Sequence, residues 1–329
     1  MKIAGYQYGS CFGPYIQQFI EKKRSIGFIY EHEEWELKHF DRFCCEKGVS
    51  ELALNRALVM EWGQLRENEF KSTSSSRFSV IRQFGLYLLS LDLEAYLPSN
   101  YSCSSKGKTH VLSDEEIAAV FRIVDQRQPV SSNLDFWRLS LEYKVILRLI
   151  YCCGLRISEA RLLKNQDVDL NRGTLRIMQS KGHKDRLVYL APDMKQLLLL
   201  YHNEIISRYK CRTEWFFPGR YPERPLPVVT IDMVFRDAWN QTSFAINCDK
   251  APTVHSLRHT FVVKRMNIWM EQGVSLKEML PYLSRYLGHT SPNETFYYYH
   301  QVDSAFKIIR QRDKSSSSVI PEVVADEKG

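Results

Sequence analysis

The chain has 329 residues, of which 44% are apolar and 25% are charged, which is ordinary for a globular protein with room for two cores. Its net charge of +7 is compatible with a polyanionic partner and does not by itself establish one. No apolar run approaches the ~18 residues of a membrane-spanning helix, and the N-terminus lacks a basic-then-apolar signal, so we expect a cytoplasmic protein.

Apolar and aromatic residues recur at helical spacing through the first hundred residues, which predicts a small all-helical domain. The four segments are Tyr15–Ile26, Trp35–Cys45, Ala57–Leu65 and Phe78–Leu91. A polar stretch rich in serine and glycine follows at 97–109, which is typical of a linker. We therefore expect one domain over residues 1–105, with a linker at about 99–110.

The second domain is predicted to begin with helices. Ser113 and Glu116 form a capping-box pattern that starts one helix, and a long apolar helix over Leu139–Tyr151 ends at Gly154. The eight cysteines include no CxxC spacing, so they indicate neither a zinc knuckle nor a disulfide framework, and we expect them to be reduced and mostly buried.

A change of period at about residue 174 predicts a β-hairpin. Thr174–Met178 and Leu187–Leu190 alternate around a turn that is rich in basic residues, Ser180–Arg186. Helices then resume at Asp193 and continue to about residue 312, and residues 313–329 have the composition of a flexible tail. The predicted fold is mainly α with a small β-hairpin or sheet, and the second domain extends over 111–312.

The segment LGHTSPNETFYYYH, residues 287–300, combines a Gly-His pair with a helix start and three adjacent tyrosines. Ser291 and Pro292 suit the first positions of a helix. On a 3.6-residue period Tyr299 joins an apolar stripe that begins at Thr295, which leaves Tyr297 and Tyr298 more available. The alternative that all three tyrosines are packing residues stays open at this point.

Basic groups in the second domain could bind one phosphate. Arg156 follows the helix stop, where a guanidinium can donate paired hydrogen bonds. Lys181 lies in the hairpin turn, His255 and Arg258 share a helix face, and His289 precedes the tyrosine helix, whereas His259 is expected to point elsewhere. Each of these groups also has an ordinary alternative, as a surface ion-pair partner, a solvated lysine or a structural histidine.

The order of these motifs closely resembles the tyrosine recombinase (phage integrase) family. GLRxSE is followed by a KGxKxR hairpin, HxLRHT, LGH and, nine residues after His289, by Tyr298 with a histidine two residues later. The helical first domain resembles the family's core-binding domain, most of all at Arg77–Leu88. The resemblance extends over nearly the whole chain and implies the compact, two-domain type of this family.

The resemblance implies a role for each matching residue. Arg156 and Arg258 would clamp the scissile phosphate, and His255 and His289 would hydrogen-bond it and assist proton transfer. Lys181 would protonate the leaving 5′ oxygen. Tyr298 would be the nucleophile that forms a 3′-phosphotyrosine link, and Glu159 would orient the site. These positive groups can neutralise a phosphodiester, so we expect no metal and no other cofactor, ATP included.

The resemblance also implies double-stranded DNA as partner and a tetramer acting on two duplexes, with an accessory DNA-bending protein as a further expected partner. The helix around residues 71–82 is expected to enter a major groove, with Lys71, Arg77 and Arg82 as candidate contacts, although each could equally be a solvated charge. The segment from about Ala305 onward is expected to pack on a neighbouring subunit.

Three alternatives to a site-specific recombinase stay open at this point. A type IB topoisomerase uses the same chemistry as a monomer. A DNA-binding protein without catalysis would use the same cations to contact phosphates and would form no covalent adduct. A helical adaptor protein would leave both arginines and Lys181 without a role.

Overall fold

The computed structural model describes residues 6–99, 109–180, 184–209, 213–289 and 294–295. The chain divides into two compact units, residues 1–106 and 107–329, which we call the N-terminal and C-terminal units. No helix within the described ranges is long and apolar enough to cross a membrane.

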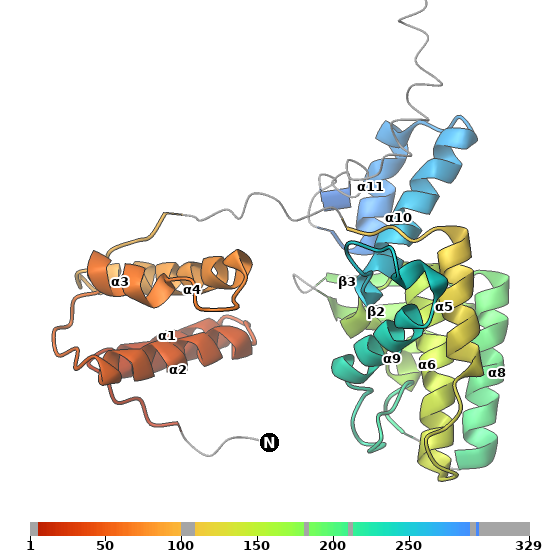
Figure 1. Ribbon diagram of the computed structural model, residues 1–329, viewed down its shortest axis with the longest axis horizontal. Coiled ribbons are helices and arrows are strands. Elements are labelled where there is room, and N and C mark those ends of the chain that lie inside the picture. The colour runs from red at the N-terminus through yellow and green to blue at the C-terminus, as the bar shows by residue number, and fades with distance from the viewer. Residues whose placement is uncertain (1–5, 100–108, 181–183, 210–212, 290–293, 296–329) are drawn as a thin grey trace, which may run out of the picture. The chain divides into compact units, whose positions relative to one another are not determined.

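The N-terminal unit is helical, as predicted. Its described part contains α1 (Gly13–Ser25), α2 (Glu31–Glu46), α3 (Arg56–Gly63) and α4 (Lys71–Leu89) (Figure 1). Helix α4 contacts each of the other three. Aromatic side chains fill the centre of the unit, where the rings of Phe12, Phe40 and Phe84 are fully buried and contact one another.

The C-terminal unit is built around α6 (Leu134–Cys153). Helix α6 contacts the helices α5 (Asp114–Gln126), α8 (Pro192–Tyr209), α9 (Val228–Asn240) and α10 (Val254–Glu271) (Figure 1). More than half of the α6 side chains are buried, because helices surround it on several sides. Two shorter helices, α7 (Ile157–Arg161) and α11 (Leu276–Leu287), follow α6 and α10 along the chain.

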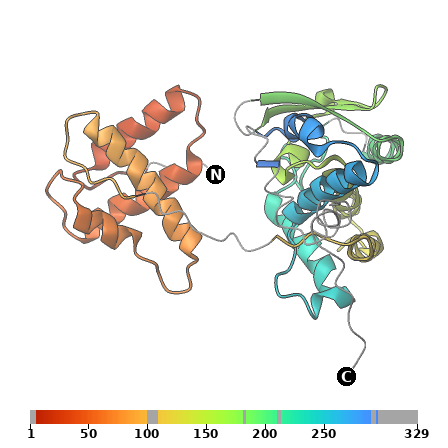
Figure 2. The same cartoon turned by 90° about the horizontal axis from the view of Figure 1, so that it is seen from above.

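A three-stranded antiparallel sheet lies at one edge of this unit, beside α11 (Figure 2). Its strands are β1 (Val168–Asp169), β2 (Thr174–Ser180) and β3 (Lys184–Tyr189), in the order β1-β2-β3. The predicted hairpin is thus confirmed, and β1 adds a short strand that the sequence did not predict because two residues show no alternation. The pairing of β2 with β3 is regular to Ile177, opposite Arg186, and irregular between Ile177 and Ser180.

The predicted signals for helix starts and stops act as expected. Ser113 and Glu116 form the capping box of α5. Gly154 ends α6 in the left-handed region with φ 60°, and a β-carbon there would lie 2.4 Å from Cδ1 of Phe261. Both the backbone conformation and the close packing therefore require glycine at this position.

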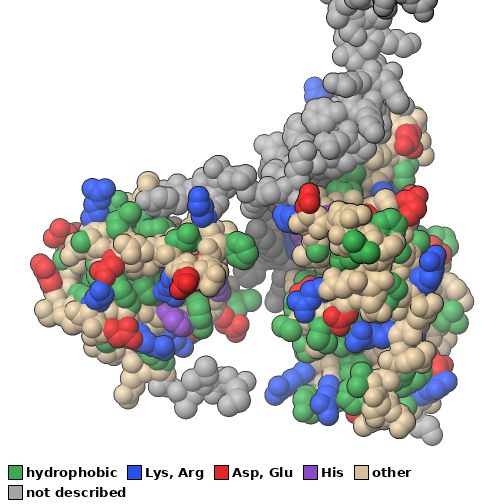
Figure 3. Space-filling model, viewed as in Figure 1, with side chains coloured by type: hydrophobic (Ala, Val, Ile, Leu, Met, Phe, Trp, Pro, Cys, Tyr) green, Lys and Arg blue, Asp and Glu red, His purple; other side chains and the backbone are tan. Residues whose placement is uncertain are grey.

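The six cysteines within the described residues are free thiols. Cys44 and Cys153 are buried, Cys45 and Cys152 are exposed, and Cys11 and Cys248 are half-buried, so the expectation of mostly buried cysteines is wrong for the described residues. Adjacent residues on a helix point about 100° apart, which explains the difference. Acidic and basic side chains are interspersed over the face of each unit shown in Figure 3.

Candidate active site

Arg258 is the fifth residue of α10 and is fully buried. Its Nη1 donates to the carbonyl oxygen of Gly154 (2.7 Å) and its Nη2 to that of Leu287 (2.8 Å). These carbonyls stand at the C-terminal ends of α6 and α11, where helical partners are missing and the helix dipole is negative. One guanidinium therefore joins the start of α10 to the ends of two other helices.

Two left-handed glycines set the positions of the neighbouring candidate residues. Gly154 ends α6 two residues before Arg156, and Gly288, with φ 67°, ends α11 one residue before His289. A glycine in this conformation reverses the chain at once. Arg156 and His289 therefore lie just beyond two helix ends that Arg258 connects to each other.

Arg156 is the N-cap residue of α7, and its side chain is 19% exposed. Its Nη1 donates to Oε1 of Glu159 (2.7 Å), and its Nη2 lies 3.3 Å from the carbonyl oxygen of Gly288. Its backbone N–H donates to Oε2 of Glu159 (2.8 Å), which fixes the carboxylate against the first turn of α7. The guanidinium is thus held on one side and retains an exposed portion.

Arg186 on β3 forms a bidentate ion pair with Glu159. Its Nη1 and Nη2 donate to Oε1 and Oε2 of Glu159 at 2.9 and 2.8 Å. Burial by itself would raise the pKa of Glu159, but the hydrogen bonds and charges of Arg186 and Arg156 outweigh it and lower the pKa to about 2. Nη1 of Arg258 also lies 3.7 Å from Oε2 of Glu159. Three guanidiniums therefore surround one carboxylate.

His289 is buried between Arg258 and Thr295. Its Nε2 lies 3.0 Å from Nη2 of Arg258, and its Nδ1 lies 2.7 Å from Oγ1 of Thr295. A guanidinium only donates, so Nε2 is the acceptor and the ring proton is assigned to Nδ1. Burial and the charges of Arg258 and Arg156 lower the pKa of His289 to about 4. The imidazole is therefore neutral at neutral pH.

His255 and His259 lie one turn apart on α10, and their rings meet edge to face with centroids 4.7 Å apart. The expectation that His259 points elsewhere is wrong, because residues four apart on a helix are neighbours. His255 is exposed, yet desolvation and the charges of Arg258 and Arg156 lower its pKa to about 4. Burial and the nearby His255 lower the pKa of His259 to about 3.

The described residues thus bring Arg156, Arg258 and His289 together around Glu159. Lys181 and Tyr298 lie outside the described residues, as do Tyr297, Tyr299, the helix start at Pro292 and the tail from residue 313. Glu294 and Thr295 are helical, and Thr295 is fully buried.

Arg186 is the functional candidate that sequence reasoning missed. The sequence shows it only as part of the basic turn Ser180–Arg186. The strand alternation contained a signal, because Arg186 falls on the same side as Val188, a position that faces the core. A cation at such a position needs a buried carboxylate, and Glu159 is that partner.

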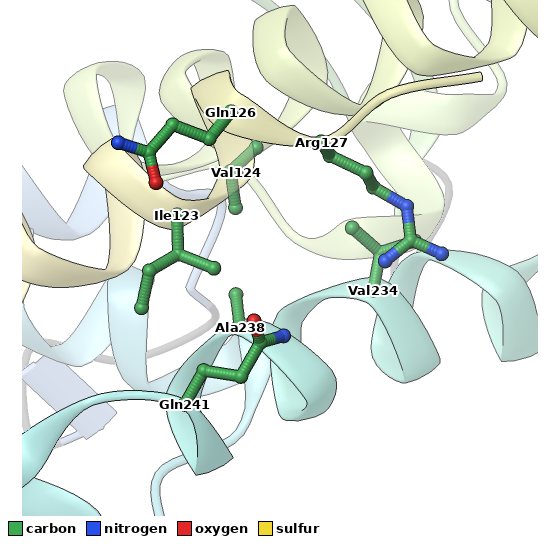
Figure 4. A pocket seen from close by; sticks show the side chains of 7 residues that line it. All are labelled: Ile123, Val124, Gln126, Arg127, Val234, Ala238 and Gln241. Atoms are coloured by element: carbon green, nitrogen blue, oxygen red, sulfur yellow. The ribbon is translucent and has the colours of Figure 1, made fainter.

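A groove of about 1090 Å³ lies between β3 and α11 beside this cluster. Arg186 and His289 contribute to its lining, together with the exposed Arg176 and Arg285. A smaller cavity of about 150 Å³ lies between α5 and α9 and is lined by residues such as Ile123, Gln126 and Gln241 (Figure 4). The described candidate catalytic residues do not line that cavity, so it is separate from the site.

The three candidate DNA contacts in the N-terminal unit differ in exposure. Lys71 is exposed at the start of α4, and Arg82 is half-buried with Nη1 donating to the carbonyl oxygen of Pro98 (2.7 Å). Arg77 is 2% exposed and donates to both carboxylate oxygens of Glu69 and to the carbonyl oxygen of Gln64. This internal role differs from the predicted DNA contact, because the guanidinium binds the segment that precedes α4 and does not face solvent.

No group of three or more His, Cys, Asp or Glu side chains within the described ranges is arranged to hold a metal ion.

Residues 111–305, more than half of the chain, match the family described as "Phage integrase family". The chain belongs to this family.

Relatives agree with this assignment, and solved structures agree with the fold. The Chlamydia caviae protein named tyrosine recombinase XerC is 32% identical over 72% of this chain and 70% of its own length. A putative integrase/recombinase of Sinorhizobium fredii, y4rE, is 25% identical over 87% of this chain and 90% of its own. The fold is similar to that of XerH site-specific recombinase bound to its difH substrate, with TM-score 0.63 and 18% identity over 93% of this chain and 84% of that one.

These findings confirm the predicted family, the mainly helical fold with its small sheet, and the predicted class of enzyme. The protein is a tyrosine-type site-specific recombinase that acts on DNA.

Proposed function

We propose that this recombinase cleaves and rejoins DNA through a covalent 3′-phosphotyrosine intermediate formed by Tyr298. The observation that carries the proposal is the convergence of Arg156, Arg258 and His289 on one point from three separate elements. In this proposal Arg156 and Arg258 bind the scissile phosphate, His255 and His289 hydrogen-bond it, and Lys181 protonates the leaving 5′ oxygen.

The charge of the cluster supports phosphate chemistry. Arg156, Arg186 and Arg258 carry three positive charges against the single negative charge of Glu159, which leaves a surplus of two. A phosphodiester carries one negative charge, and its pentavalent transition state develops more on the equatorial oxygens. A buried, preorganised surplus of positive charge stabilises that transition state more than the ground state.

The two histidines of the proposed site are neutral, so they add no positive charge that would repel its arginines. The lowered pKa values of His255 and His289 leave both rings uncharged at neutral pH, where they can donate or accept a hydrogen bond. An arriving phosphate would raise both pKa values, because its negative charge favours the protonated rings. The two histidines are therefore suited to proton transfer near the phosphate.

The intermediate conserves the energy of the phosphodiester bond. Attack of the tyrosine oxygen on phosphorus forms one phosphoester bond and breaks the bond to the 5′ oxygen. The phenolic proton passes to a neutral histidine of the site, and the 5′ oxygen leaves as a hydroxyl with the proton from Lys181. Another strand's 5′ hydroxyl can then reverse the reaction and release the tyrosine. We accordingly propose that no ATP and no metal ion is required.

Double-stranded DNA is the proposed partner, with four subunits joining two duplexes. The XerH structure holds DNA, and a lambda integrase structure contains a dimer bound to a core site. For this chain, the exposed Lys71 and the half-buried Arg82 are the proposed contacts of the N-terminal unit. The segment after about Ala305 is proposed to contact a neighbouring subunit, and an accessory DNA-bending protein to assist assembly.

Covalent trapping tests the nucleophile. Nicked duplexes tiled across the DNA that flanks the gene would be incubated with the full chain, and adducts that survive denaturing electrophoresis would identify a trapping duplex. Tyr298→Phe should abolish the adduct, whereas Tyr297→Phe and Tyr299→Phe serve as matched controls that keep it. An adduct formed by Tyr298→Phe would contradict the assignment, and tight DNA binding without any adduct would favour a non-catalytic DNA-binding protein.

A further inference from the structure

A cysteine, a histidine and a glutamate form a second group of connected ionisable side chains in the C-terminal unit. Sγ of Cys248 lies 3.6 Å from Nδ1 of His110, and Nε2 of His110 lies 3.0 Å from both carboxylate oxygens of Glu116. Cys248 follows the short helix η2 (Ser243–Ala245), His110 precedes α5, and Glu116 lies in the first turn of α5. A nucleophile, a base and a carboxylate that orients the base are the parts of an activated thiol.

The contacts of His110 indicate which of its nitrogens carries the proton. A carboxylate only accepts hydrogen bonds, so Nε2 donates to Glu116 and the lone pair of Nδ1 faces Sγ of Cys248. Glu116 is itself held by the capping box of α5, where its Oε2 accepts from the backbone N–H of Ser113 (2.8 Å). In this tautomer the imidazole can take a proton from the thiol.

The imidazole of His110 is also held in place by packing. The indole of the buried Trp239 on α9 meets its ring edge to face, with the centroids 5.4 Å apart. Two residues further along the chain, the backbone N–H of Leu112 donates to Oγ1 of the fully buried Thr260 on α10 (3.0 Å). A base that is fixed through both its ring and its backbone is preorganised for proton transfer.

The thiol of Cys248 is accessible from solvent. The residue is half-buried, and residues 246–247 and 249–250 on either side of it are exposed. Its Sγ also lies 3.2 Å from the carbonyl oxygen of Lys250, which is a second acceptor for its proton. A small reagent can therefore approach the sulfur without entering the core.

Cys45 and Cys152 provide a contrast, because both are exposed and neither is activated. Within the part of the chain that the structure describes, no histidine lies within hydrogen-bond distance of either thiol. Partial desolvation and the charge of Asp41 raise the pKa of Cys45, and desolvation and the charge of Asp193 raise the pKa of Cys152. Exposure and activation thus occur at different cysteines.

We propose that Cys248 is a modification site that undergoes thiol–disulfide exchange with low-molecular-weight disulfides of the glutathione type, with His110 as the general base and Glu116 as the group that orients it. The Sγ proton passes to Nδ1 of His110, and the thiolate attacks one sulfur of the small disulfide. A new S–S bond forms, the old one breaks, and the departing thiolate takes the proton from His110. Cys248 is oxidised to a mixed disulfide, and half of the small disulfide is reduced to a thiol. The site is independent of the proposed strand cleavage.

Site-resolved kinetics test the proposal. The full chain, freed of reducing agent, would be incubated with oxidised glutathione at neutral pH, and the mixed disulfide at each cysteine would be followed by peptide mass spectrometry. Cys248 should react at least about tenfold faster than Cys45 and Cys152, although both are more exposed, because its thiol has a positioned base and theirs lie where the thiolate is disfavoured.

Removal of the base should slow this reaction selectively. His110→Gln should lower the rate at Cys248 by about tenfold and leave that at Cys45 unchanged; the factor is limited because a free thiol is already ionised to a few per cent at neutral pH. His202→Gln is a matched control, since the ring of His202 stacks on Phe216 in the same unit. It should leave the rate at Cys248 unchanged.

The buried Cys153 reports whether a variant has folded. It is 2% exposed, and burial raises its pKa to about 12, so it should stay unmodified in each folded variant. If His110→Gln exposes Cys153, Glu116→Gln replaces it, because it removes the orienting charge at nearly constant size and should slow Cys248 by about threefold. The comparison among the wild-type cysteines needs no variant. A wild-type Cys248 that reacts no faster than Cys45 and Cys152, or a rate that a folded His110→Gln leaves unchanged, would overturn the inference.

Discussion

The C-terminal unit contains two buried arginine–glutamate clusters that differ in charge balance. Arg138 and Glu142, both on α6, are 1% and 0% exposed and form an ion pair. Arg138 also donates to the carbonyl oxygens of Pro218 (2.6 Å) and Gly219 (2.7 Å). In the other cluster, Glu159 forms ion pairs with Arg156 and Arg186, and Arg258 lies 3.7 Å away.

Their carboxyl groups respond in opposite directions to burial. Desolvation raises the pKa of Glu142 well above its usual range, because Arg138 only partly compensates it. The pKa of Glu159 falls to about 2, because Arg186 and Arg156 outweigh the same desolvation. Buried ion pairs are therefore not equivalent: the first cluster has no surplus positive charge and supports the fold, whereas the second has a surplus that suits an anionic substrate.

The largest effect is expected from breaking the first cluster. Arg138→Met should lower the free energy of unfolding by about 3–5 kcal/mol, because it leaves Glu142 without its buried cation and two carbonyls without donors. The rate of adduct formation per folded molecule should stay unchanged. Urea denaturation and active-site titration would measure the two quantities, and a slower reaction at unchanged stability would contradict the division between the clusters.

A smaller effect is expected from acid, and it should appear at the second cluster. Burial lowers the pKa values of His289 to about 4 and of His259 to about 3. Between pH about 6.5 and 4 the unfolded chain binds protons that these folded-state rings do not, so the free energy of unfolding should decrease as the pH falls through this window, by about 2 kcal/mol for each buried histidine.

Hydrogen exchange of the α10 amides at several pH values would measure this loss. Glu159 contributes separately and at lower pH, because its carboxylate stays ionised in the folded state down to about pH 2 while an unfolded glutamate takes up its proton near pH about 4.3. If the exchange protection of the α10 amides stays constant between neutral pH and pH about 4, the histidines are not desolvated as described.

The parts of the site that depend on local rules are predictable from the sequence. Capping patterns and glycine stops depend on nearby residues, so Ser113, Gly154 and the start of α10 were predictable, and with them the placement of Arg156 and Arg258. The family resemblance supplied the roles. The prediction for His259 is wrong because its four-residue spacing from His255 brings the two rings into contact.

Long-range ion pairs were not predictable in the same way. Arg186 and Glu159 are 27 residues apart in the chain, and Arg77 meets Glu69 only because the segment before α4 folds back. Nothing in the spacing of those charges distinguishes a buried pair from two solvated side chains. Alternation suggests a buried position for Arg186 but does not identify the carboxylate, because that depends on how the hairpin packs on α7.

The smallest expected effect extends the comparison to the N-terminal unit, where Arg77 forms a buried ion pair and Lys71 is exposed. If Lys71 contacts a phosphate, Lys71→Ala should weaken binding to the trapping duplex and reduce the slope of log K against log salt by about 0.9. Arg77→Met should leave that slope unchanged while it destabilises the unit, because its guanidinium is occupied by Glu69 and Gln64. Binding titrations at several salt concentrations would measure both slopes. A reduced slope for Arg77→Met, with Lys71→Ala unchanged, would mean that the pair opens on DNA and that burial in the free protein does not separate structural from DNA-binding arginines.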